Sequence, residues 1–277
     1  MYLIGNLLFM CYSKEVQLIT SLIILLSAGI YYFYYSKNSK ELWRKSFLKM
    51  SMLVFLCIGL HQFFEFLSLL TNNNLIYKIG LIISICGVYF LLRSLEVLSN
   101  KNYYSGIAII PITLVSLQVL FSNMVFSEAS FYLKHNSAFF WAAMWLFLFI
   151  YWHICAFKTY SETKNDASKK TLLIYLLSVA DLSFILSAVY VITGYFIFSV
   201  NVCTDSPSIW CTFYVIQSVL IPLLMMRLSH HFKRPIKFRR ISLKQLIIFF
   251  SVSFLILLLM ALTLPFFNCL TWKFIFP

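Results

Sequence analysis

The stretch Phe47–Leu70, FLKMSMLVFLCIGLHQFFEFLSLL, has only two charged side chains, Lys49 and Glu65. A helix needs about 20 apolar residues to cross the hydrocarbon core of a bilayer, so this stretch is long enough to span a membrane. Its ionisable pair, His61 and Glu65, is four residues apart and therefore shares one face of a helix. Ionisable side chains are costly inside a membrane, so this pair is the first candidate for a functional site.

The composition of the whole chain agrees with this reading of one segment. Of its 277 residues, 61% are hydrophobic and 11% are charged, whereas soluble domains carry about 25% charged residues. Several further apolar runs reach the length of a membrane-spanning helix. We therefore predict an all-α fold, a polytopic bundle of seven to eight transmembrane helices with both termini outside.

Eight apolar segments are the predicted spans, at about 16–35, 47–70, 75–98, 104–126, 137–157, 171–198, 209–228 and 245–267. The chain then divides into an amphipathic lead (1–15), a seven-helix core (16–228), a basic loop (229–244) and an additional helix with its tail (245–277). No loop between these spans is long enough for a soluble domain.

The positions of Lys and Arg predict the orientation. The loops after the first, third, fifth and seventh spans hold 18 of these residues, and the opposite side holds 4. Because basic loops stay in the cytoplasm, both termini should face outward. The same rule explains the net charge of +13 without a nucleic-acid partner. We expect the loop at 229–244 to contact anionic headgroups of the lipid bilayer.

This orientation gathers four reactive side chains near the outer surface. Glu65 lies in the outer third of its span, with His61 one turn deeper, while Cys11 precedes the first span and Cys211 opens the seventh. Such a set can ligate Zn²⁺ or Cu⁺, or combine a thiolate with an acid and a base. No Cys-x-x-Cys spacing supports a metal site. The alternative is a disulfide or buried thiols, with His61 and Glu65 bonded to neighbours, and the pattern specifies no cofactor.

The other cysteines divide by position. Those inside spans are expected to be small buried side chains, namely Cys57, Cys86 and Cys155. The outward ones can form disulfides in an oxidising compartment, namely Cys11, Cys203, Cys211 and Cys269. Cys211 could pair with Cys203, which is close in sequence, or with Cys11, and the sequence leaves this choice open.

Other ionisable residues also lie within predicted spans. Asp181, near the middle of the sixth, is either a relay carboxylate or a hydrogen-bonded packing group. His153, near the inner end of the fifth, is expected at the membrane interface. Arg93 and Glu96 are three residues apart and can pair on one helical face. Near the end of their span, they are expected to reach toward the interface.

Three short motifs resemble a family of uncharacterised bacterial multi-pass membrane proteins. The family begins Met-Cys-x-Ser, like 10–13 here; it has Gln-Gln-x-x-Glu-Gly in its second span, like 61–66, and Ser-x-Trp-Cys-x-Phe opening a late span, like 208–213. The resemblance covers about 10–228, with His61 in place of a Gln and Phe66 in place of the Gly. It implies a bacterial inner-membrane location and supplies no reaction. It also makes Met10 an alternative start to Met1, and removal of that Met would leave Cys11 with a free amine beside its thiol.

Three function classes are compatible with these patterns. The first is a membrane protein with an outward-facing Cys/His/Glu pocket that binds a metal or a small or lipid-derived ligand, with Glu65 as its charged centre. The second is a transporter or an ion- or proton-conducting protein that uses Asp181, His61 and Glu65. The third is a structural or sensory bundle whose ion pairs fix helix register. Whether the protein is an enzyme is open.

Overall fold

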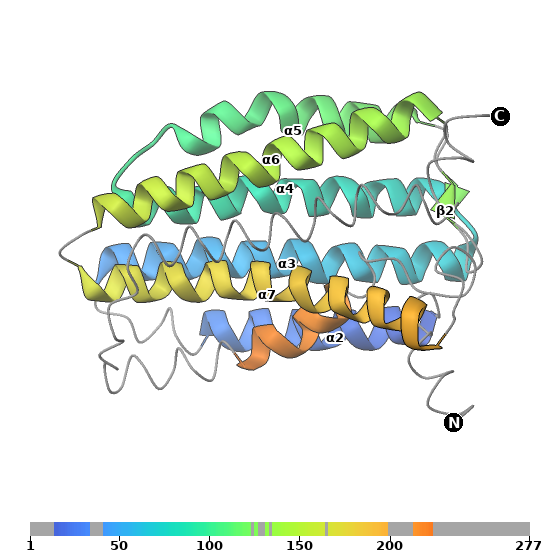
Figure 1. Ribbon diagram of the computed structural model, residues 1–277, viewed down its shortest axis with the longest axis horizontal. Helices are drawn as coiled ribbons and strands as arrows, with labels where there is room; N and C mark the ends of the chain where they lie inside the picture. Colours follow the sequence, from blue (N-terminus) through green and yellow to red (C-terminus); the bar gives the residue numbers. More distant parts are fainter. Residues whose placement is uncertain are drawn as a thin grey trace.

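The computed structural model describes residues 14–33, 41–122, 125–126, 131–132, 135–163, 166–198 and 213–223. These residues form long helices that lie side by side with roughly parallel axes and alternate in direction along the chain (Figure 1). In order they are α2 (Lys14–Tyr31), α3 (Leu42–Thr71), α4 (Asn74–Ser99), α5 (Tyr104–Phe121), α6 (His135–Glu162) and α7 (Ala167–Phe198), followed by a shorter helix at Phe213–Leu223. Two short strands, β1 (Val125–Phe126) and β2 (Phe131–Tyr132), pair antiparallel between α5 and α6.

Four of the helices are long and apolar enough to cross a membrane: α3, α4, α5 and the Ala167–Ser187 part of α7. Large apolar side chains cover the outside of the bundle, including Ile110 on α5 and Leu26 on α2. In water these apolar surfaces would favour aggregation, whereas in a bilayer they would contact apolar lipid chains. The protein is therefore membrane-embedded.

The turn between α3 and α4 is short and well capped. Asn72 ends α3 in the left-handed conformation, at φ 51°, and its N–H donates to the carbonyl of Ser68. Asn is one of the few residues that tolerate this conformation. The side chain of Asn73 then accepts from the N–H of Leu75 and caps the start of α4. The two helices therefore form a tight antiparallel hairpin.

Small residues on α4 let it approach α3 closely. Gly80, Ser84 and Gly87 follow helical spacing and lie on one face of α4. A Cβ added at Gly80 would lie 2.8 Å from Cβ of Phe64, and one at Gly87 would lie 3.2 Å from Cβ of Cys57. Close backbone approach over small residues is a standard way for helices to pack in membranes. It fixes the depth at which His61 faces α4.

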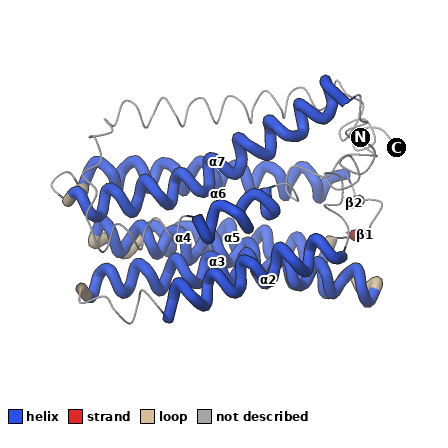
Figure 2. Tube along the Cα trace, turned by 90° about the horizontal axis from the view of Figure 1, so that it is seen from below, coloured by secondary structure: helices blue, strands red, loops and turns tan. Residues whose placement is uncertain are grey.

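The layers of the bundle place α3 of this hairpin at one side and α4 in the middle. Seen from below, α2 and α3 lie on one side, α6 and α7 on the other, and α4 and α5 between them (Figure 2). Residues of α3, α4, α5, α6 and α7 share one hydrophobic core, which includes Leu48, Ile85, Val115, Ala156 and Leu173.

The predicted span at 104–126 is too long at its end. The helix α5 ends at Phe121, and Val125–Phe126 pairs with a second strand instead. Lys78 Nζ donates to the carbonyls of Leu120 at 3.0 Å and Ser122 at 2.5 Å. A cation at a helix C-terminus satisfies open carbonyls and the negative end of the helix dipole, which stops the helix here.

Other helices are longer than the predicted spans, because polar helical turns continue beyond the apolar segment. The helix α3 begins at Leu42, five residues before the predicted span, and α6 continues to Glu162, beyond the predicted end at 157. The predicted lead at 1–15 lies mostly outside the described residues, and the basic loop at 229–244 and the span at 245–267 lie wholly outside them.

Candidate functional site

The predicted pair on α3 forms in the structure. His61 Nε2 lies 3.3 Å from Glu65 Oε1, and both residues are buried, with exposures of 1% and 4%. Gln62 Nε2 donates to the other carboxylate oxygen, Glu65 Oε2, at 2.8 Å. The expectation that His61 and Glu65 share a face is confirmed. An amide and an imidazole from the same helix therefore hold the carboxylate.

The second nitrogen of this imidazole, His61 Nδ1, is buried and has no hydrogen-bond partner. It faces α4 at Gly80, where an added Cβ would lie 3.5 Å from it. A neutral imidazole that donates from Nε2 to Glu65 keeps a lone pair on Nδ1, whereas an imidazolium would leave a buried N–H without an acceptor. The second state is the more costly one. The geometry therefore favours a neutral His61 with an unused acceptor on Nδ1.

A third helix covers the pair. The ring of Tyr214, from the Phe213–Leu223 helix, lies 4.8 Å from the ring of His61. The hydroxyl of Tyr214 shares a hydrogen bond of 3.1 Å with Ser84 Oγ of α4. The α3–α4 hairpin and a helix that is distant from it in sequence thus meet at His61.

The helix α2 adds a polar face near the same depth. A Cβ added at Gly59 would lie 2.8 Å from the side chain of Leu25, so α2 and α3 are close at this level. Because these helices run in opposite directions (Figure 1), Ser21, one turn before Leu25, lies near the level of Gln62, one turn after Gly59. Ser21 is fully buried, and its hydroxyl has no hydrogen-bond partner. Buried polar groups without partners call for water or a ligand.

A second histidine–carboxylate pair joins α6 to α7. His153 Nε2 lies 2.9 Å from Asp181 Oδ1, and these residues are 0% and 2% exposed. The ring of His153 is enclosed between helices, and its expected position at the membrane interface stays a prediction. Asp181 is hydrogen-bonded, as its packing reading expects, and its reading as a relay carboxylate stays a prediction.

This second pair is closed, meaning that both ring nitrogens of its histidine have partners, whereas the first is open because His61 Nδ1 has none. His153 Nδ1 lies 2.9 Å from the carbonyl oxygen of Phe149, which can only accept, so Nδ1 carries a proton. The contact with Asp181 then holds one further proton, on either partner, and the pair is neutral overall in both cases. Both ring nitrogens of His153 are satisfied. The pair therefore fixes α6 against α7 and offers no free group to a ligand.

Glu96 is also closed. Its carboxylate accepts from Arg93 at 2.7 Å and from the backbone N–H and hydroxyl of Ser105 at the start of α5. The predicted pairing with Arg93 is confirmed. The expectation that the side chain of Glu96 reaches outward to the interface is wrong, because it is only 2% exposed and bonds to Ser105. A carboxylate at a helix N-terminus neutralises open N–H groups and the positive end of the dipole.

The thiols of the predicted pocket, Cys11 and Cys211, lie outside the described residues, as do the other outward cysteines, Cys203 and Cys269. Within spans, Cys57 and Cys155 are buried as expected, and Cys86 is half-buried. In the part of the chain that the structure describes, no three His, Cys, Asp or Glu residues are arranged to hold a metal ion.

No family model, curated protein or solved structure matches this chain. The resemblance to a bacterial membrane family stays a prediction from three motifs.

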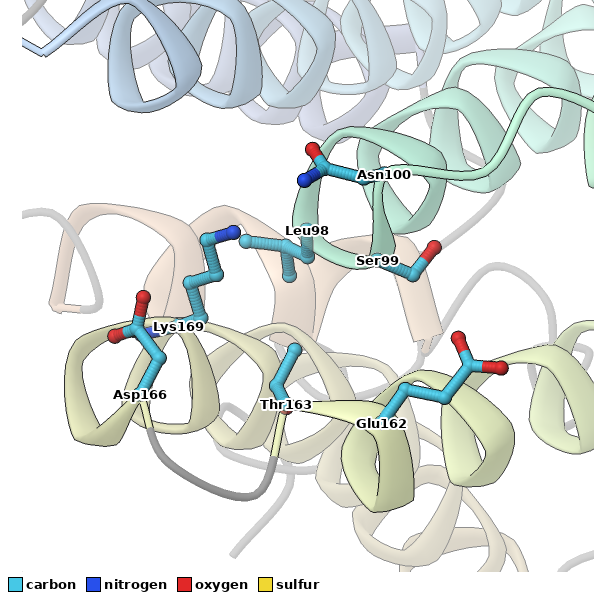
Figure 3. Close-up of a pocket in the computed structure, with 7 residues that line it drawn as sticks. All are labelled: Leu98, Ser99, Asn100, Glu162, Thr163, Asp166 and Lys169. Carbon is cyan, nitrogen blue, oxygen red and sulfur yellow. The ribbon is translucent and has the colours of Figure 1, made fainter.

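A separate polar pocket lies at the opposite end of the bundle, where α4 and α6 end and α7 begins (Figure 3). It has a volume of about 310 Å³ and is lined by Leu98, Ser99, Asn100, Glu162, Thr163, Asp166 and Lys169. Its polar groups already serve the helix ends. Asp166 Oδ1 caps α7 by accepting from two backbone N–H groups, and Glu162 lies 3.8 Å from Lys101. We therefore centre the functional site on His61.

Sequence reasoning missed the residues that surround this centre. Ser84 could have been found from its place between Gly80 and Gly87 on one helical face. Tyr214 follows the motif cysteine Cys211 by three residues, so a helical reading of this stretch of sequence would have drawn attention to Tyr214 as well. No sequence signal pointed to Ser21.

Proposed function

We propose that this is a multi-pass protein of seven to eight spans in a bacterial inner membrane, with a ligand-binding site in its outer half. The site centres on His61 and Glu65 of α3. The excess of Lys and Arg in alternate loops supports an orientation with both termini outside. In that orientation the α3–α4 turn faces outward, and Glu65 lies beneath it. The basic loop at 229–244 would meet anionic headgroups on the inner face.

One observation carries the proposal: His61 Nδ1 is buried, unpartnered and backed by a carboxylate on the other ring nitrogen. A carboxylate on one nitrogen orients the ring and makes the other nitrogen a better base or ligand. The same arrangement serves general-base sites and metal sites. The closed pair at His153 shows that this chain can satisfy a buried imidazole fully, so the open one calls for a further group.

The positions of the two thiols, Cys11 and Cys211, are inferred from the sequence alone. With Cys11 and Cys211 at the outer rim, the site would have soft ligands for Zn²⁺ or Cu⁺, or a nucleophile beside a base. Without them, His61 and Glu65 would bind a small or lipid-derived polar group. A transporter that uses Asp181 would need a group free to exchange protons, and the closed His153–Asp181 pair does not favour it.

The test compares ligand classes on the purified protein in mild detergent. Zn²⁺, Cu⁺, small amines and short-chain phospholipids are added in turn, and thermal unfolding is measured. A ligand of this site should stabilise the wild type by about 2.7 kcal/mol at 100 times its dissociation constant. The effect should vanish in His61→Gln and Glu65→Gln and persist in His153→Gln, a matched change at the closed pair. Equal stabilisation of all four proteins by every active ligand would contradict the proposal.

A further inference from the structure

The polar pocket at the end of the bundle has a cationic side chain without an ion-pair partner among the described residues. Lys169 reaches from α7 toward the end of α4 and lines this pocket (Figure 3). Within the described residues its ammonium makes no hydrogen bond or ion pair, and it lies over the ring of Trp43, 5.2 Å from the centroid. A ring face attracts a cation but offers its N–H groups no oxygen or nitrogen acceptor. Lys169 therefore keeps N–H donors for a ligand in the pocket.

The two carboxylates of the pocket are already balanced by other groups. Asp166 accepts from two backbone N–H groups at the start of α7, where the helix dipole is positive. Glu162 lies 3.8 Å from the ammonium of Lys101. Each carboxylate thus has its own positive neighbour, and the charge of Lys169 is left over. An anionic ligand would balance this charge, whereas a cationic ligand would add to it.

A second open donor lies at the end of α4. Asn100 ends this helix in the left-handed conformation, at φ 54°, and its side chain enters the same pocket (Figure 3). Its side-chain amide makes no hydrogen bond within the described residues, and the amide NH₂ can donate twice. The pocket, at about 310 Å³, is at the lower end of the size range of small-molecule sites. It therefore offers two donor groups to one small anion.

We propose that this pocket binds the phosphate group of an anionic ligand, with Lys169 and Asn100 donating to the phosphate oxygens. Phosphate is a strong acceptor, and lysine commonly binds it as a point charge. The phosphate belongs either to the headgroup of an anionic phospholipid or to a small soluble phosphate ester. Trp43, beside Lys169, favours the lipid, because Trp is enriched where a bilayer meets water. In the proposed orientation this end faces the cytoplasm, where anionic headgroups concentrate. The site is separate from the one at His61.

The test compares probes by native mass spectrometry of the purified protein in mild detergent. Short-chain phosphatidylglycerol and glycerol phosphate carry an anionic phosphate, whereas in short-chain phosphatidylcholine the choline cancels the charge. Phosphatidylglycerol should bind more tightly than phosphatidylcholine if a lipid headgroup is the source. Binding of glycerol phosphate without this lipid preference would identify a soluble ester as the source. If both anions bind, the tighter one names the source.

Two variants with matched controls test the assigned contacts. Lys169→Gln removes the charge, so the affinity for the anionic probe should fall about tenfold or more. Lys170→Gln should leave it unaltered, because Lys170 lies over the ring of Tyr160 and does not line the pocket. Asn100→Gly removes the amide and keeps the left-handed backbone, so the affinity should fall about threefold or more. Asn72→Gly, at the same conformation after α3, should leave it unaltered.

The outcomes separate this inference from the proposed function. Full affinity in Lys169→Gln or Asn100→Gly would overturn the assigned contacts. Equal losses in Lys169→Gln and Lys170→Gln would also overturn the proposal, since they are the result of a diffuse surface charge. So would equal binding of the two lipids together with no binding of glycerol phosphate. His61→Gln should bind the anionic probe like the wild type, so a failure at this pocket leaves the site at His61 standing.

Discussion

Replacement of Gly80 by alanine tests the contact that positions the site. The new Cβ would lie 2.8 Å from Cβ of Phe64, about 0.7 Å closer than carbon atoms normally pack. Phe64 Cβ is fixed to the backbone of α3 and cannot rotate away, so the two helices must separate. Overpacking of this kind costs about 1–3 kcal/mol, against a gain in helix propensity of up to about 1 kcal/mol. We therefore expect a net loss of up to about 2 kcal/mol.

Gly106→Ala is the matched control, because no atom lies within 4 Å of the added Cβ in α5. It should gain helix propensity without a clash and leave the protein as stable as the wild type or more so. The free energy of unfolding would be measured for both variants by titrating SDS into mild detergent and following helix content. If Gly80→Ala proves as stable as Gly106→Ala, the close approach of α4 to α3 is not as described, and the placement of His61 Nδ1 falls with it.

Three further predictions concern the closed pairs and one exposed pair. Glu96→Gln should lower the free energy of unfolding by about 1.5–3 kcal/mol, because it weakens charged hydrogen bonds in a buried site, while Glu41→Gln, in the half-exposed pair with Arg44, should cost less than about 1 kcal/mol in the same SDS titration. A double-mutant cycle of His153→Gln and Asp181→Asn should give a coupling energy of about 0.5–3 kcal/mol, and additivity would remove the proposed lock between α6 and α7. The hydrogen bond from Lys158 lowers the pKa of exposed Tyr103, so Lys158→Met should raise that pKa in an absorbance titration corrected with Tyr103→Phe. The stabilisation from this pair is present above the ordinary pKa of tyrosine and is lost as the pH falls through the lowered value.

Local patterns in the sequence predicted the features that depend on interactions within one helix. Hydrophobic length located the long helices, and the spacing of four between His61 and Glu65 predicted their contact, since a helix fixes that geometry by itself. The pairing of Arg93 with Glu96 was within reach for the same reason. Helix ends were less predictable. The end of α5, for example, is fixed by hydrogen bonds from Lys78, which belongs to α4.

Contacts between distant segments could not be predicted in this way. His153 and Asp181 are 28 residues apart and meet only because α6 packs against α7. The burial of Glu96 depends on the position of Ser105 after a turn, and the cover over His61 comes from Tyr214, at the far end of the chain. In each case tertiary packing decides whether a polar group is exposed or enclosed. Such packing between distant segments cannot be read from the local patterns of one sequence.

The two-residue turn at Asn72 and Asn73 has a consequence for how the protein is made. A helix that carries a carboxylate and an imidazole enters a bilayer poorly when it enters alone. With such a short connection, α3 and α4 can leave the insertion machinery as one preassembled hairpin, with Glu65 and His61 already turned toward their neighbour. Lengthening this turn would then reduce the yield of inserted protein even where the finished bundle is equally stable.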